Sequence, residues 1–351
     1  MGRSKKSRQI IEADMAWDSN SRPEMIEFLY VVPNNIAEAI LAVVTKDLPA
    51  TRNCRLSLMS LKPATDPAGH FYLKSSKDEW FLRATRRQRK NQDMEDIIAF
   101  YLSNNGIKVN LPILTNLNIV WKGYTYLLYI FPFIKGRHYN GSDSDLIAIS
   151  STVVNMHSLL KSFKFSKLIY ANALKTANRL LRAKRAISRS LEKNDFSIFE
   201  ERREWAERNS DWLRTMSDDF NPFLCKLPES QCLHGELHLG NVIFSAENGE
   251  VLLTDFEEVW DAWFPPSFDL AYLVHRFCMD GVPSRESFHQ KLSIVERGYG
   301  SLPPALKAMM SQVCWYNIAL LIDRSLRRES ISPEEEYNKF VRFEKLSKSL
   351  F

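Results

Sequence analysis

Two short segments in the second half of the chain constrain the fold more than any other feature. Residues 234–241 read H-G-E-L-H-L-G-N, and residues 255–257 read D-F-E. Between them lie two short apolar runs, at 242–244 and 251–254, which flank the polar sequence E-N-G-E at 247–250. Asn-Gly between apolar runs is a strong hairpin signal. The pattern therefore predicts a β-hairpin that follows a polar loop and ends at a carboxylate.

The polar side chains of these segments suit one kind of chemistry. Glu236 offers a carboxylate as a base, while Asn241 and Asp255 offer oxygen atoms at either end of the expected hairpin. Phosphoryl transfer needs a residue that orients the attacking hydroxyl and oxygen ligands for magnesium. The set predicts Glu236 as catalytic base and Asn241 and Asp255 as metal ligands. The alternative is that Asn241 and Asp255 merely begin and end strands.

Composition is that of a globular protein, because 45% of the 351 residues are hydrophobic and 25% are charged. The five cysteines form no C-x-x-C pair and are typical of reduced, mostly buried thiols in a cytoplasmic protein. No apolar stretch is long enough to span a bilayer. Residues 2–8 carry part of the net charge of +5, and no apolar segment follows them as in a signal peptide. We expect residues 1–24 to form a basic, solvated, flexible tail.

The remaining chain separates into a strand-rich half and a helical half. Period-two and apolar runs predict strands at 55–61, 71–74, 80–84 and 124–131, with one helix at 94–102. Helical patterns cover 146–163, two or three helices within 171–216, and the region from Asp269 onward. We expect a sheet-rich lobe over 25–133, a helical lobe over 134–351, and a hinge near 131–135. Whether residues 1 to about 50 belong to the first lobe stays open.

These motifs resemble the aminoglycoside phosphotransferase and choline kinase group, the small-molecule branch of the protein-kinase-like fold. The family's catalytic loop reads roughly H-G-D-x-H-x-G-N, and its metal strand reads I-D-F-[DE] followed by P-x-x-x-D-L-A. Here residues 265–271 read P-P-S-F-D-L-A, and residues 128–137 (L-Y-I-F-P-F-I-K-G-R) are similar to a variant of the family's hinge. Residues 154–158 are similar to the family's helix that ends near L-H-S. The resemblance covers about residues 70–325.

The resemblance implies a bilobal α+β fold, with a small antiparallel-sheet N-lobe and a larger, mostly helical C-lobe. It also implies a kinase that uses ATP and Mg to phosphorylate a hydroxyl of a small molecule, with GTP as an open alternative donor. Aminoglycoside-like, aminocyclitol, amino-alcohol and sugar acceptors all fit. We expect no nucleic-acid partner and no membrane partner, and the oligomeric state stays open, with a homodimer as one option.

Two departures from the related patterns bear on activity. Glu236 stands where the family normally has Asp, one methylene shorter, and Gly69 is the only glycine between Arg55 and Lys74, so a glycine-rich phosphate loop is missing. The leading interpretation is an active kinase. The alternative is a catalytically weak pseudokinase or nucleotide-binding scaffold. A protein kinase is disfavoured, because the loop lacks H-R-D and no A-P-E follows Asp255.

The resemblance also implies roles for individual side chains. His234 would brace the catalytic loop and Asp255 by hydrogen bonds, and Asp269 would support the loop backbone from a buried position. His157, on an amphipathic helix, is read as a core histidine.

The expected nucleotide site lies in the first lobe. Arg83, with Glu95 as its ion-pair partner, is the favoured phosphate-binding cation, and Lys74 is the competitor. Phe131 and Phe133 of the hinge complete the site.

Acceptor contacts are expected from residues near the two motifs: Glu257, Glu258, Trp260, Asp261, Trp263 and His238. An acidic, aromatic pocket suits a cationic amine. The alternative is that the tryptophans simply pack the lobe. Basic residues within 179–203 alternate with glutamates, which is typical of a solvated helix face rather than a nucleic-acid interface.

Overall fold

The chain divides into two compact units. The computed structural model describes residues 29–52, 54–59, 67–85, 92–279 and 285–326, so the expected tail over 1–24 lies outside it. The first unit comprises Met1–Asp145 and Gly240–Asp255, and the second comprises Leu146–Leu239 and Phe256–Phe351. Sheets dominate the first unit and helices the second, as expected for an α+β protein.

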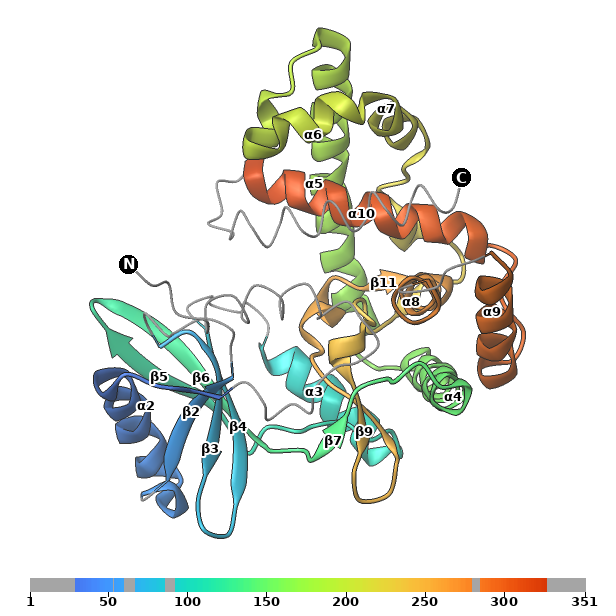
Figure 1. The fold of residues 1–351 in the computed structure, drawn as a ribbon. Helices are drawn as coiled ribbons and strands as arrows, with labels where there is room; N and C mark the ends of the chain where they lie inside the picture. Colours follow the sequence, from blue (N-terminus) through green and yellow to red (C-terminus); the bar gives the residue numbers. More distant parts are fainter. Residues whose placement is uncertain (1–28, 53, 60–66, 86–91, 280–284, 327–351) are drawn as a thin grey trace, which may run out of the picture. The chain divides into compact units, whose positions relative to one another are not determined.

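A six-stranded antiparallel sheet with strand order β1-β2-β3-β4-β6-β5 forms the first unit's frame (Figure 1). Its strands are β1 (Leu29–Val31), β2 (Arg55–Met59), β3 (Gly69–Lys74), β4 (Glu79–Thr85), β5 (Leu114–Trp121) and β6 (Tyr124–Pro132). Helix α2 (Asn34–Asp47) and the short 3₁₀ turn η1 (Pro49–Thr51) lie between β1 and β2, and α3 (Gln92–Asn104) follows β4. Four of these strands and α3 confirm the elements expected from the pattern.

The prediction of one helix in the first half was wrong, because α2 is a second one. Ile36, Ile40 and Val44 recur every fourth residue and pack into the sheet's core. This spacing was masked by Pro33, which interrupts the apolar run but stands at the N-cap, where the helix tolerates it. Strand β5 was also missed, because a bulge between Leu114 and Leu117 breaks the period of two.

A second sheet, of order β10-β9-β7, completes the first unit. It contains β7 (Gly136–Arg137) and the predicted hairpin of β9 (Val242–Ser245) and β10 (Val251–Leu253), which is confirmed. Gly136 is required here, since a Cβ atom would lie 2.3 Å from the carbonyl oxygen of Phe244 on β9. The strand β7 pairs with β9 of the first unit, and the first unit extends beyond β7 to Asp145. The expected lobe boundary after Phe133 stays a prediction.

The second unit is mostly helical, as expected. Its helices are α4 (Asp143–Leu160, which begins at the end of the first unit), α5 (Ser166–Lys193), α6 (Arg203–Arg208), α7 (Ser210–Asp219), α8 (Ser267–Leu273), a π-helical turn (Val274–Cys278), α9 (Arg285–Tyr299) and α10 (Leu306–Leu326). Short elements complete it: 3₁₀ turns η2 (Ser197–Arg202), η3 (Leu224–Lys226), η4 (Leu239–Asn241, which ends in the first unit) and η5 (Glu257–Trp260), with strands β8 (Gln231–Cys232) and β11 (Trp263–Phe264).

Helix α10 organises the packing of the second unit. It contacts both α5 and α8, and the crossing of α5 and α10 is visible in Figure 1. Phe268 of α8 stacks on Phe264 at a centroid distance of 4.2 Å and meets Tyr316 of α10 edge-on at 5.3 Å. Within the described ranges, no helix combines the length and the apolar character that crossing a membrane requires. The five cysteines are free thiols, and all but Cys54 are buried, as expected.

The α2 core makes a direct stability prediction. Ile40 is fully buried, so Ile40→Ala should lower the free energy of unfolding by about 2–5 kcal/mol, through lost burial and a residual cavity. Ile113 belongs to the same unit but is 45% exposed, so Ile113→Ala is the matched control and should cost far less. Urea unfolding followed by tryptophan fluorescence measures both. Equal losses would contradict the placement of α2 in the core.

Candidate active site

A buried carboxylate holds the backbone of the loop that begins at His234. Asp269, on α8, has no exposed surface. Its Oδ2 accepts the backbone N–H of His234 at 2.9 Å, and its Oδ1 accepts the N–H of Gly235 at 2.8 Å. A buried carboxyl group is tolerated only when its oxygens are hydrogen-bonded, so this geometry explains both its burial and the shape of the loop. The expectation that Asp269 is buried and supports the loop is confirmed.

His157, on α4, joins the same cluster. Its Nε2 lies 3.1 Å from Asp269 Oδ2, and its Nδ1 lies 2.9 Å from the hydroxyl of Tyr299 on α9. A carboxylate only accepts, so Nε2–H donates to Asp269 and, in the neutral ring, Nδ1 accepts from Tyr299. Burial, aided by the charge of Asp269, raises the pKa of Tyr299 to about 12, which keeps its proton in place. His157 is thus a satisfied core histidine, as expected.

Gly235 allows the loop to turn. Its φ is +89°, and a Cβ atom there would lie 2.7 Å from the Cβ of Ala262. His234 is fully buried beside it, and its ring lies 4.7 Å from the ring of Phe256. The Nδ1 atom of His234 accepts the backbone N–H of Glu236 at 3.4 Å. His234 therefore braces the loop as expected, while its expected bond to Asp255 stays a prediction.

Three carboxylates gather next to this loop. Oxygen atoms of Glu236, Glu257 and Glu258 all lie within 4.8 Å of one another, and each side chain is half-buried. Sequence reasoning placed these residues in separate roles and missed the cluster, because Glu236 and η5 meet only through the tertiary fold. The pKa of Tyr272 on α8 is raised, mainly because the hydroxyl is buried and then because the charge of Glu236 is near. The three side chains therefore form one acidic cluster within the second unit.

The two expected metal ligands stand at the open end of the β9–β10 hairpin. Val242 pairs with Leu253, and the N–H of Thr254 donates to the carbonyl of Asn241 at 3.0 Å. This register puts Asn241 and Asp255 at adjoining positions of the first unit. Asp255 has a φ of +59°, a left-handed conformation that is uncommon outside glycine but tolerated by Asp. Such local strain is characteristic of functional sites.

Arg83 reaches this end of the hairpin from the large sheet. Its guanidinium Nη1 lies 3.0 Å from Asp255 Oδ1, and both side chains are mostly buried. From the sequence, Arg83 is the favoured phosphate-binding cation and Lys74 its competitor. Lys74 instead pairs with Glu79 at 3.0 Å, at the far end of the β3–β4 hairpin, and this hydrogen bond raises the pKa of Lys74. The expected ion pair between Arg83 and Glu95 of α3 stays a prediction.

The two hinge phenylalanines are both half-buried and packed on β-strand neighbours. The ring of Phe131 lies 5.9 Å from that of Phe81, and the ring of Phe133 lies 4.8 Å from that of Tyr72. The backbone N–H of Phe133 donates to the carbonyl of Glu79 at 3.1 Å. Their expected contact with a nucleotide stays a prediction.

The residues expected to meet the acceptor follow Asp255 closely. Trp260, Asp261 and Trp263 are half-buried, and Trp263 meets Tyr170 of α5 edge-on at a centroid distance of 6.0 Å. The carboxylate of Asp261 accepts hydrogen bonds from two side chains of α5. His238 is half-buried in the loop. Acceptor contact by these residues stays a prediction.

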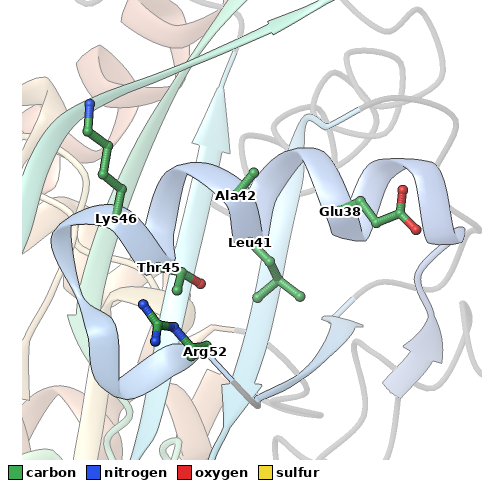
Figure 2. A pocket seen from close by; sticks show the side chains of 6 residues that line it. All are labelled: Glu38, Leu41, Ala42, Thr45, Lys46 and Arg52. Atoms are coloured by element: carbon green, nitrogen blue, oxygen red, sulfur yellow. The ribbon is translucent and has the colours of Figure 1, made fainter.

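An open hollow of about 500 Å³ lies elsewhere, along the exposed side of α2 (Figure 2). It is lined by Glu38, Leu41, Ala42, Thr45, Lys46 and Arg52. None of the residues expected to carry chemistry lines it, so it plays no part in the candidate site.

The tight turn at Gly235 gives a second stability prediction. Gly235→Ala should lower the free energy of unfolding by about 1–2 kcal/mol, because alanine disfavours a left-handed backbone. The clash with Ala262 should lower it by about 1–3 kcal/mol more. Gly300 has a similar φ of +96° with open space around it. Gly300→Ala should therefore lose only the free energy that the left-handed backbone costs an alanine. Thermal unfolding of both variants measures the difference. Equal destabilisation would show that the Ala262 contact does not constrain the loop.

Comparison with known proteins identifies the family. Residues 61–302, more than half of the chain, match the model of the phosphotransferase enzyme family. No curated protein sequence matches the chain.

Three similar solved structures share the fold. The choline kinase LicA from Streptococcus pneumoniae is 13% identical, with a TM-score of 0.53, over 90% of this chain and 99% of that one. The microcompartment-associated aminopropanol kinase is 14% identical, with a TM-score of 0.51, over 87% and 95%. The spectinomycin phosphotransferase APH(9)-Ia, in complex with ADP and spectinomycin, is 16% identical, with a TM-score of 0.50, over 83% and 88%.

At such identities the solved structures establish the fold, and the family match establishes the enzyme class. The expected protein-kinase-like fold and the expected resemblance are both confirmed. The chain belongs to the phosphotransferase enzyme family.

Proposed function

We propose that this protein is an ATP- and Mg-dependent phosphotransferase that acts on a hydroxyl of a small, cationic acceptor. The observation that carries the proposal is the arrangement at the end of the β9–β10 hairpin. There, Asn241 and Asp255 stand at adjoining positions, and Arg83 contacts the Asp255 carboxylate. An amide oxygen, a carboxylate and a guanidinium in one place match what a metal-bound polyphosphate needs.

The donor set fits magnesium. This ion prefers oxygen ligands and keeps several waters, so Asn241 and Asp255 together with phosphate oxygens are sufficient. When bound, it neutralises charge on the transferred phosphoryl group. The carboxylate of Asp255 already lies against one cation, Arg83, and its backbone is in the left-handed conformation.

Arg83 is our candidate for phosphate binding. Its planar guanidinium can donate two parallel hydrogen bonds to phosphate oxygens, which a lysine cannot do. Lys74, which is 57% exposed and paired with Glu79, is the weaker candidate. Phe131 and Phe133 would border the nucleotide, and Glu95 would steady Arg83.

Glu236 is our candidate for the catalytic base. Its carboxylate would orient the acceptor hydroxyl and accept its proton. Glu257 and Glu258, which lie close to Glu236, would attract an acceptor with a protonated amine. Trp260, Trp263 and His238 would add aromatic contacts, since cations bind well over aromatic faces. Choline and aminopropanol, after which two of the similar structures are named, are therefore the first acceptors to test.

The alternative is a nucleotide-binding pseudokinase. Two observations support it: Glu236 replaces the family's usual Asp, and the Arg83–Asp255 ion pair engages a carboxylate that the metal would need. A strong ion pair would compete with magnesium for Asp255.

A screen separates the two functions. Purified protein with ATP and Mg should phosphorylate at least one of choline, 1-amino-2-propanol, spectinomycin and a panel of amino sugars. Glu236→Gln should then lower kcat by about 10²–10⁴-fold, because the base is lost, and leave the KM for ATP nearly unchanged. Glu229→Gln, at an exposed position of the same unit, is the control. A thermal shift with ATP but no turnover on any acceptor would favour the pseudokinase.

The metal assignment has a test of its own. Asp255→Asn should reduce turnover by about 10²-fold or more and should raise the Mg²⁺ concentration needed for half-maximal rate, since a charged ligand is removed. Asp47→Asn, on the exposed end of α2, should leave both quantities unchanged. Full activity of Asp255→Asn at ordinary Mg²⁺ would mean that another residue binds the metal.

A further inference from the structure

The loop that follows Asp255 is fastened to α5 by side-chain hydrogen bonds. Asp261, directly after η5, accepts at Oδ1 from Asn172 Nδ2 at 2.5 Å and from Thr176 Oγ1 at 2.7 Å. Asn172 Nδ2 also lies 3.3 Å from the carbonyl of Trp260. Asn172 and Thr176 are four residues apart, so both face the loop from one side of the helix. The loop is therefore held at its C-terminal end by a fixed helix surface.

A second row of contacts stands behind the first. The Oγ1 atom of Thr176 accepts from Arg179 Nη2 at 2.9 Å, and Arg179 Nε lies 3.3 Å from Asp323 Oδ2 on α10. The Nε atom makes no aligned hydrogen bond, so this last contact is an attraction of charges. Contacts thus run from α10 through α5 to the loop. We call the five residues Asp323, Arg179, Thr176, Asn172 and Asp261 the α5 ladder.

Thr176 is the central member of the α5 ladder. Its side chain is only 2% exposed, and its single hydroxyl proton goes to Asp261 while its oxygen accepts from Arg179. Both contacts involve charged groups, which makes them stronger than bonds between neutral groups. Replacing the hydroxyl by a methyl group would leave Asp261 and Arg179 each short of one partner. Burying such groups without partners is costly.

What the ladder holds in place is the 3₁₀ turn η5, which carries Glu257 and Glu258. Oxygen atoms of these two carboxylates lie within 4.8 Å of an oxygen of Glu236. Helix α5 packs against η5, so the hydrogen bonds of Asp261 to α5 hold the short segment that carries both carboxylates.

We propose that the α5 ladder positions Glu257 and Glu258 against Glu236 and thereby sets the enzyme's affinity for a cationic acceptor. Asn172, Thr176 and Arg179 are positioning residues, and Asp261 anchors the loop to them. The nature of the ligand rests on the proposed function, whereas the placement of the loop does not.

Amide hydrogen exchange of the full-length protein without ligands tests the placement. In Thr176→Val, amides of peptides within residues 256–264 should exchange about tenfold faster or more, because a charge-assisted hydrogen bond no longer opposes local opening. Thr176→Ser keeps the hydroxyl and should restore the parental rate. Thr152→Val removes a hydroxyl that bonds only along α4, and it should leave these peptides unchanged.

Steady-state kinetics tests the consequence for the acceptor. Thr176→Val should raise the KM for choline or 1-amino-2-propanol several-fold and leave the KM for ATP unchanged, and Thr176→Ser should reverse the effect. If Thr176→Val does not fold, Asn172→Ala, at a half-buried position, takes its place in both measurements.

The outcomes separate the two levels of the inference. Parental exchange rates in Thr176→Val and Asn172→Ala would overturn the α5 ladder as a support. Faster exchange with an unchanged KM for the amine would overturn its role in acceptor affinity. If Thr176→Val exchanges faster but the parental protein phosphorylates no acceptor, the proposed function is wrong. The α5 ladder is then still supported as a structural feature.

Discussion

The fully buried carboxylate of Asp269 is the interaction on which the second unit's part of the site depends. It accepts two consecutive backbone N–H groups, of His234 and Gly235, and the ring of His157. Two adjacent amides can reach one carboxylate only if the chain turns sharply between them, which is why a glycine with φ of +89° stands at the turn. The burial of one charge therefore dictates the loop's backbone, and the loop's backbone dictates where Glu236 begins.

The same carboxylate joins helices that are distant in sequence. His157 comes from α4, Tyr299 from α9 and Asp269 from α8, and all three side chains meet in one hydrogen-bonded row. Such a row is stable only when each member is satisfied, because an unpaired buried group costs more than a bond contributes. The conformation of the loop that begins at His234 therefore depends on how α4, α8 and α9 pack together.

Much of the fold and part of the candidate site could be predicted from the sequence. The features that could not be predicted depend on tertiary contacts or on interrupted patterns. The Asn-Gly turn and the apolar runs around it specify the β9–β10 hairpin locally, so its register and the adjoining placement of Asn241 and Asp255 follow. Helix α2 was missed because a proline at its N-cap interrupts the apolar pattern. The carboxylate cluster and the contacts of Asp261 with α5 join residues far apart in sequence, and no local pattern encodes such contacts. The contact of Arg83 with Asp255 likewise joins residues far apart in sequence, so the sequence did not predict it.

The candidate residues of the two units, each unit taken by itself, have opposite charge environments. In the first unit, Asp255 lies against a guanidinium, so its charge is compensated before any ligand binds. In the second unit, an oxygen of Glu236 lies within 4.8 Å of oxygens of Glu257 and Glu258. Under the proposed function, three carboxylates this close together would attract a protonated amine. If the proposed function holds, this cluster favours an acceptor that brings its own positive charge over a neutral sugar.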